Sequence, residues 1–144
     1  LVTIEDTFEI NCRVDDWVAM QTRTMVGEGV TEIDMRRLVR ESLRMRPTRI
    51  AVGEVRGPEA LDMLLAFNSG VPGFCTVHAN SASQALAKIA SLPLLAAPNV
   101  DAAFVSRLAS QSIGLIAHCE KVGPSTRRIA ELLEVRDESF GERT

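Results

Sequence analysis

Three features are scarce or missing in this chain of 144 residues, and each argues against a class of protein. No apolar run approaches the ~20 residues that a membrane-spanning helix needs. Only Trp17 and five phenylalanines are aromatic, so the chain lacks a set of rings on which nucleic-acid bases could stack. The formal net charge of −3 gives no general attraction to nucleic acid either. We therefore expect no direct contact with nucleic acid.

The cysteines are few and oddly numbered: Cys12, Cys75 and Cys119, without C-x-x-C spacing. This pattern argues against a disulfide framework and suits a reducing compartment such as the cytoplasm. Cys75 and His78 share one predicted strand end, and Cys119 follows His118. Neither pair has the spacing of known zinc ligands, so we expect no zinc site.

Lysine is rarer still, because only Lys88 and Lys121 occur, and neither follows a glycine. The phosphate-binding motif G-x-x-x-x-G-K-[ST], the Walker A, is therefore absent. That loop supplies a nest of backbone N–H groups and a lysine to the phosphates of a nucleotide. This chain alone is expected neither to bind ATP tightly nor to hydrolyse it.

Arginine, by contrast, makes up 14 of the 16 basic residues, and most of the arginines precede residue 57. The planar fork of donors on arginine suits phosphate and carboxylate groups. Arg23, Arg44, Arg46 and Arg49 are candidates for charge supplied to a nucleotide, including across a subunit interface. Codon usage in a GC-rich genome is an alternative cause of the total. A surface or ion-pair role is the alternative for each residue.

A short apolar segment at residues 50–53 is bounded by Pro47 and Gly57 and predicts a strand buried on both faces. Glu54 and Arg56 follow it, at the end where open α/β sheets bind ligands. In a nucleotide-binding sheet, this is the place for a carboxylate that holds Mg²⁺ through water. The alternative is that Glu54 and Arg56 pair with each other or face solvent at a strand end.

Two further segments have the same plan of an apolar strand followed by polar residues. Residues 1–4 predict a strand ending at Glu5 and Asp6, with Glu9 four residues beyond Glu5. Residues 74–78 predict a strand ending at His78. Taken alone, the acidic residues could form a solvated turn, and His78 could be structural, as we expect His118 to be.

The rest of the first half predicts one more strand and two helices. A strand is expected at 17–22 and a turn at 27–29, and Pro47 should end the helix that follows. Thr31 is the predicted N-cap of that helix, whose buried face comprises Met35, Leu38, Val39, Ser42 and Leu43. Pro58 should open the next helix, which has Gly70 beyond its end and Leu61, Leu64 and Leu65 on its buried face.

The second half predicts two helices and a hairpin. Ser81 and Gln84 form a capping box that opens a helix through about residue 89. The two prolines of residues 92–100 predict a loop, and residues 100–112 a helix with Val100, Phe104 and Leu108 buried. Residues 113–119 and 127–135 predict a hairpin around residues 123–125. Strands alternating with helices indicate an α/β fold with a largely parallel sheet.

Three of these segments, in their order and spacing, resemble the motifs of the secretion traffic ATPases. The segments are TIEDTFE (3–9), IAVGEVRG (50–57) and TVHANS (76–81), which look like the Asp box, the Walker B and the His box of that family. The family includes the motors of type II and type IV secretion, Tad pili and conjugal transfer. RLVRESLRMRPTRI (37–50) looks like the Tad-pilus and conjugal-transfer branch. The resemblance is strong over residues 1–92 and weak beyond.

The resemblance implies a RecA-like, mostly parallel sheet flanked by helices, with a C-terminal β-hairpin. It places residues 1–144 in the C-terminal portion of a RecA-like P-loop ATPase domain, beginning after the Walker A helix. The chain, which begins with Leu1, is then expected to be part of a longer protein or the product of a broken gene. ATP and Mg²⁺ are the implied cofactors of the full-length protein.

The resemblance also implies roles for the residues of the three motifs. Glu5 would activate the attacking water, and Glu9 is the second acidic position of the same box. Which of the two does more stays open. Asp6 would orient the loop and contact the nucleotide.

Glu54 would hold Mg²⁺ through water, and Arg56 would fix that carboxylate. His78 would sense the γ-phosphate or link it to the neighbouring motif. Arg23, Arg46 and Arg49 would supply positive charge to the nucleotide.

At the level of the whole protein, the resemblance implies a homohexameric ATPase. It would be cytoplasmic and peripheral at the inner membrane, where it drives pilus assembly or substrate transport with platform proteins of that membrane. The alternative is a degenerate or regulatory RecA-like module that lacks nucleotide hydrolysis. The coding sequence before Leu1 would separate the two, because only the motor needs a Walker A there.

Overall fold

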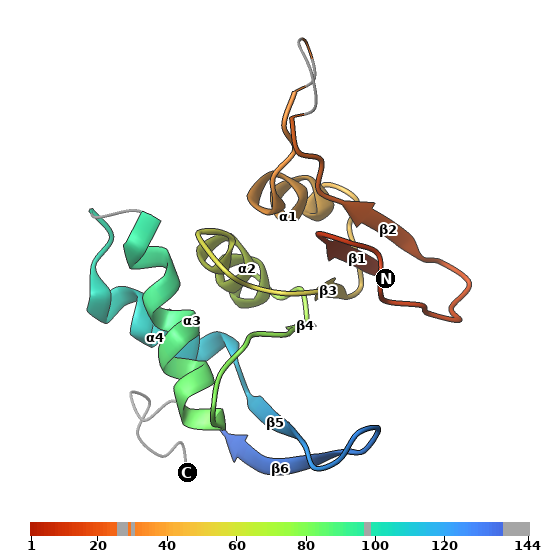
Figure 1. Cartoon of the computed structure of the whole chain (residues 1–144). Helices are drawn as coiled ribbons and strands as arrows, with labels where there is room; N and C mark the ends of the chain where they lie inside the picture. The colour runs from red at the N-terminus through yellow and green to blue at the C-terminus, as the bar shows by residue number, and fades with distance from the viewer. Residues whose placement is uncertain (26–28, 30, 97–98, 137–144) are drawn as a thin grey trace, which may run out of the picture.

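A parallel sheet and a separate hairpin, joined by helices, make up the fold (Figure 1). The structure, a computed structural model, describes residues 1–25, 29, 31–96 and 99–136. The sheet has the order β2-β1-β3-β4, with all neighbouring strands parallel. Its strands are β1 (Val2–Glu5), β2 (Val18–Gln21), β3 (Ile50–Val52) and β4 (Gly73–Cys75). The predicted α/β class and parallel sheet are confirmed.

The two central strands carry the core. Every residue of β1 and β3 is buried, as the apolar runs at 1–4 and 50–53 predicted. In the register of the sheet, Ile4 lies opposite Met20 on one side and Val52 on the other, and Val52 lies opposite Cys75. The strands therefore end at the same level, and the residues that follow them meet at one edge. Residues 5–10, 53–57 and 76–78 form this carboxyl edge.

The fourth strand is shorter than predicted. β4 ends at Cys75, whereas the sequence predicted a strand to residue 78. The backbone still continues beside β3 for one residue, because Thr76 N–H donates to the Val52 carbonyl at 3.3 Å and Val55 N–H to the Thr76 carbonyl at 2.9 Å. His78 thus follows an irregular segment and does not end a strand.

Helix α1 (Met35–Leu43) begins later than predicted. Its N-cap is Asp34, whose Oδ1 accepts from Arg37 N–H at 2.7 Å. Thr31 cannot cap it, because the chain before Asp34 is extended and Ile33 pairs with Arg23. The predicted apolar face is buried except for Leu43, which is exposed. Of the predicted turn at 27–29, residues 27 and 28 lie outside the described residues.

Helix α2 (Glu59–Asn68) follows Pro58, as predicted, and ends before Gly70, whose φ of +91° confirms a left-handed C′ glycine. The predicted buried face of α2 is only partly correct. Leu64 is buried, but Leu65 is exposed and Leu61 only half-buried. The helix is instead buried through a broader set, since it packs against α1, α3 and α4: Glu59, Ala60, Asp62, Met63, Leu64 and Ala66.

Helix α3 (Ala82–Ala96) is longer than predicted. Its start is confirmed, since Ser81 Oγ accepts from Gln84 N–H at 3.1 Å. The predicted loop at 92–100 is wrong in its first part, because the helix runs through Pro93. Leu92 and Pro93 are both buried, and this packing outweighs the local cost of a proline inside a helix. Residues 97 and 98 lie outside the described residues.

Helix α4 (Ala102–Ser112) packs against α2 and α3. It starts at the N-cap Asp101, whose carboxylate accepts from Phe104 N–H at 2.7 Å. The buried residues are Val105, Leu108 and Ala109, so Leu108 was predicted correctly. Phe104, predicted to be buried, is exposed. None of the described helices is long and apolar enough to cross a bilayer.

The C-terminal hairpin is confirmed. β5 (Leu115–Lys121) and β6 (Arg127–Glu134) pair in antiparallel register, with an irregularity between His118 and Cys119. The hairpin forms a second sheet and does not extend the first. Glu131 of β6 joins it to α3, because its Oε2 accepts from Ala82 N–H at 2.8 Å.

Candidate functional site

The carboxyl edge brings together residues that lie far apart in the sequence. Glu54 Oε1 lies 3.2 Å from His78 Nε2, and Arg56 binds the other oxygen, Oε2. The three side chains come from the segments after β3 and β4, whose strands are neighbours in the sheet. The Glu54 carboxylate is thus held between a guanidinium and an imidazole, and these two contacts set its orientation. The structure shows the pairing of Glu54 with Arg56, which is compatible both with a Mg²⁺-binding role of Glu54 and with a merely structural ion pair.

The charges at this edge favour an ionised Glu54. The hydrogen bond from Arg56 is the main cause that lowers the pKa of Glu54, and the charges of Arg56, His78 and Lys88 act in the same direction, against partial desolvation. Glu54 raises the pKa of Arg56 in return. The Glu54 side chain is 20% exposed and the His78 side chain 85%, so a ligand can reach both.

Glu5, at the end of β1, is buried, unlike the other acidic residues of its loop. Its Oε1 accepts from Glu9 N–H at 2.9 Å and from Ile10 N–H at 2.8 Å. Its Oε2 is buried with no hydrogen-bond partner among the described residues. Glu5 therefore shapes the loop at 6–10 with one oxygen and leaves the other free. Glu9 itself is exposed on that loop.

Asp6 joins the same loop to the end of β2. Its Oδ1 accepts from Thr22 Oγ1 at 3.0 Å, and its main-chain carbonyl accepts from Gln21 Nε2 at 3.0 Å. Both contacts position the loop after β1 against the neighbouring strand. They fit the predicted orienting role of Asp6, and its contact with a nucleotide stays a prediction.

Of the candidate arginines, Arg46 and Arg49 do not join this edge within one chain, whereas Arg23 follows the carboxyl end of β2. Arg49 directly precedes β3 and Arg46 lies before it, so both are at the opposite edge of the sheet from Glu54. Arg46 has a φ of +53° and follows α1, whose C-cap is Arg44. The Arg23 guanidinium donates to the Thr31 carbonyl at 3.3 and 3.2 Å.

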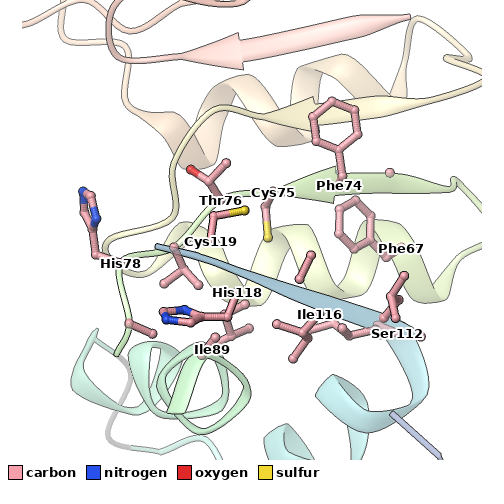
Figure 2. Close-up of a pocket in the computed structure, with 18 of the residues that line it drawn as sticks. Phe67, Phe74, Cys75, Thr76, His78, Ile89, Ser112, Ile116, His118 and Cys119 are labelled. Carbon is pink, nitrogen blue, oxygen red and sulfur yellow. The ribbon is translucent and has the colours of Figure 1, made fainter. Parts of the chain in front are cut away.

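A pocket of about 570 Å³ lies between β4 and β5. Figure 2 shows the residues from Phe74 to His78 and from Ile116 to Cys119 running in the same direction on its two sides. Most lining side chains are apolar, and His78 lies at one end. Burial raises the pKa of Cys75, on the β4 side, to about 11. The sequence pattern did not predict this pocket, because its walls are 40 residues apart.

Two buried carboxylates of α2 were not identified from the sequence. Glu59 accepts hydrogen bonds from the turn that carries Arg56, and Asp62 binds Arg36 and Arg40 of α1. A signal for Glu59 was its place in the first turn of a helix, three residues after Arg56, where a side chain can cap a preceding turn. Among the described residues, no three His, Cys, Asp or Glu side chains are close enough to hold a metal ion by themselves.

A carboxyl edge of this kind, on a parallel sheet followed by an antiparallel hairpin, belongs here to a type II/IV secretion system protein. The chain matches the family "Type II/IV secretion system protein" over residues 1–141 and belongs to it. A putative conjugal transfer protein of Mycobacterium tuberculosis is 39% identical over 137 residues, which cover 94% of this chain and 38% of that protein. The probable conjugal transfer protein TrbB of Sinorhizobium fredii is 36% identical over 136 residues, with the same coverage.

A solved structure agrees in fold. The VirB11 ATPase of the Brucella suis type IV secretion system, crystallised with sulphate, superimposes with a TM-score of 0.77 at 26% identity. The match covers 92% of this chain and 39% of the VirB11 chain. The chain therefore spans about two fifths of the length of these relatives.

Proposed function

We propose that this chain is the C-terminal portion of a RecA-like ATPase domain whose full-length protein hydrolyses ATP to power pilus assembly, conjugal transfer or secretion. The observation that carries the proposal is Glu54, held between Arg56 and His78 at the carboxyl edge and beside the loop that Glu5 organises. Phosphoryl transfer to water needs an oriented water, Mg²⁺ and positive charge near the phosphate oxygens. The residues of this edge offer the side chains for each need.

The carboxylates at the carboxyl edge suit Mg²⁺ as it is bound in nucleotide sites. Mg²⁺ keeps several waters and takes few protein ligands besides the phosphates. Glu54 has an oxygen within reach of solvent, and Glu5, at the end of the neighbouring strand, has a buried oxygen without a partner in the described part of the chain. Glu54 would hold the ion through water, and the ion would offset charge on the phosphates of ATP.

The different burial of the two Asp-box glutamates supports a proposal of different roles for them. Glu5 is buried and bound to backbone N–H groups, so it holds the loop in place. Glu9 is exposed on that loop and can approach a water beside the γ-phosphate. We assign general-base work to Glu9, with Glu5 as its support and Asp6 as the orienter of the loop. His78, exposed and 3.2 Å from Glu54, would report the γ-phosphate to Glu54.

The pocket between β4 and β5 fits the view of a partial domain. Its two sides run in the same direction and present backbone edges of two separate sheets (Figure 2). A further strand of a complete domain could lie there and pair with both. Because the chain also lacks a Walker A motif, we expect no ATP hydrolysis from these 144 residues alone.

The full-length protein would be a cytoplasmic homohexamer, peripheral at the inner membrane and bound to platform proteins there. Arg23, Arg46 and Arg49 would then act from a neighbouring subunit, since Arg46 and Arg49 lie away from Glu54 in their own chain. Residues 37–50 favour the Tad-pilus and conjugal-transfer branch, and no direct nucleic-acid contact is expected.

Because these 144 residues lack a Walker A motif, we also consider a second candidate function, a regulatory RecA-like module that does not hydrolyse ATP. The test is to produce the protein with the coding sequence that precedes Leu1 and to measure Mg²⁺-dependent release of phosphate from ATP. Turnover that Glu54→Gln abolishes supports the motor. A preceding sequence without G-x-x-x-x-G-K-[ST], together with no turnover, supports the regulatory module.

A further inference from the structure

Glu59 lies in the first turn of α2, and its carboxylate points back to the chain before the helix. Only 7% of the residue is exposed. Its Oε1 accepts from Arg56 N–H at 2.6 Å and from Gly57 N–H at 2.7 Å. A carboxylate that accepts two backbone N–H groups holds a turn more tightly than a neutral acceptor does. Glu59 therefore fixes the backbone of the residue that binds Glu54.

The surrounding turn is built for this contact. A methyl group on Gly57 would lie 3.2 Å from Glu59 Oε2, closer than most such contacts, so glycine leaves room for the carboxylate. On the other side of Arg56, Val55 is buried and its N–H donates to the Thr76 carbonyl at 2.9 Å. Arg56 is thus held by its neighbours and by Glu59, while its guanidinium extends to Glu54.

We propose that Glu59 is a positioning residue that holds the turn at 55–57 so that Arg56 presents its guanidinium to Glu54. The proposal rests on the ATPase function proposed above for its effect on turnover. Its structural part, the hold on the turn, can be tested separately. Without Glu59, the Arg56 backbone loses its acceptor, and the orientation of Glu54 is no longer set.

Asp62 provides a matched control on the same helix. It lies three residues after Glu59 and is 8% exposed, so the two carboxylates are equally buried. Its oxygens accept from Arg36 Nε and Arg40 Nε, each at 2.7 Å, and so they join α2 to α1 instead of to the carboxyl edge. Loss of Asp62 should destabilise the protein without touching the turn at Arg56.

The experiment compares Glu59→Gln, Gly57→Ala and Asp62→Asn in the full-length protein. Residue-resolved hydrogen exchange measures the hold on the Arg56 and Gly57 amides, and steady-state kinetics measure kcat and KM for ATP per folded molecule. For Glu59→Gln we expect at least about tenfold faster exchange of both amides and a kcat about 10–100-fold lower, with KM changed less than about threefold. Gly57→Ala, which crowds the same carboxylate, should act in the same direction but less strongly.

Asp62→Asn should lower the melting temperature but leave the two amides and kcat per folded molecule unchanged. The proposal is overturned if Glu59→Gln leaves the exchange of both amides at the wild-type rate, or if Asp62→Asn reproduces the loss of kcat. If the wild-type protein shows no ATP turnover, the proposed function fails. The exchange data then still decide whether Glu59 holds the turn, so the two failures can be told apart.

Discussion

Gly53 lies against the side chain of Glu5, so that a methyl group on Gly53 would come within 2.9 Å of Glu5 Cγ. The same methyl group would lie 3.4 Å from the Ile4 carbonyl oxygen. Only glycine fits between β1 and the carboxyl edge without displacing a buried carboxylate. The absence of a side chain on Gly53, the residue before Glu54, therefore leaves room for the Glu5 side chain of the neighbouring strand β1.

The first prediction follows from that contact. Gly53→Ala should lower the free energy of unfolding by about 1–3 kcal/mol, the usual cost of overpacking a buried site. Chemical denaturation measures the change. Gly114→Ala is the control, because no atom lies within 4 Å of its added methyl group and its φ is ordinary. Equal stability of the two variants would mean that Glu5 moves aside at no cost.

The second prediction separates the two glutamates of the Asp box. Glu5→Gln should reduce both stability, by about 1–3 kcal/mol, and turnover, because its oxygen binds two backbone N–H groups. Glu9→Gln, at an exposed position, should leave the melting temperature unchanged and lower kcat by about 10²–10⁴-fold. Thermal melts and ATP turnover on the same preparations give both quantities. Normal turnover in Glu9→Gln would return the role of base to Glu5.

The third prediction concerns pH. The Arg56 guanidinium lowers the pKa of Glu54, so the stability that this ion pair adds is present above the ordinary glutamate pKa of ~4.3. It is lost as the pH falls through the lowered pKa of the folded state. Wild type should therefore be more stable than Glu54→Gln at pH 7, and the difference should vanish in acid. Denaturation of both proteins from pH 7 to pH 3 measures it, and a constant difference would contradict the ion pair.

The fourth prediction concerns the thiols. Burial raises the pKa of Cys75 to about 11, so roughly one molecule in a thousand carries its thiolate at pH 8. Cys119 is exposed and should react with iodoacetamide much faster. Single-cysteine variants followed by mass spectrometry measure both rates. Because the pKa of Cys75 is higher in the folded than in the unfolded state, its ionisation should lower the free energy of unfolding as the pH rises from about 9 to 11.

The sequence predicted the parts of this protein that local pattern controls. Apolar strands followed by polar residues indicated the places of Glu5 and Glu54, and the family motifs gave the order of the segments. His78 was identified by its motif, since its strand ends earlier than predicted. The long-range features were not accessible. Pro93 stays helical because it is packed, and Leu65 is exposed although its helix packs against three others. The hold of Glu59 on the Arg56 backbone depends on the course of one turn, which no periodicity encodes.

The fifth prediction concerns His78, which the sequence identified through its motif alone. Its side chain is 85% exposed and its Nε2 lies 3.2 Å from Glu54, so little apolar surface is lost when it is removed. In the full-length protein, His78→Ala should leave the melting temperature nearly unchanged and lower ATP turnover and transport. His118→Ala is the control, since that histidine lies on β5 and, among the described residues, His78 is the histidine that pairs with Glu54, so the change should leave turnover unchanged. Thermal melts and turnover on one preparation separate the two roles. A structural His78 would instead show a lower melting temperature with normal turnover per folded molecule, and this result would remove it from the site.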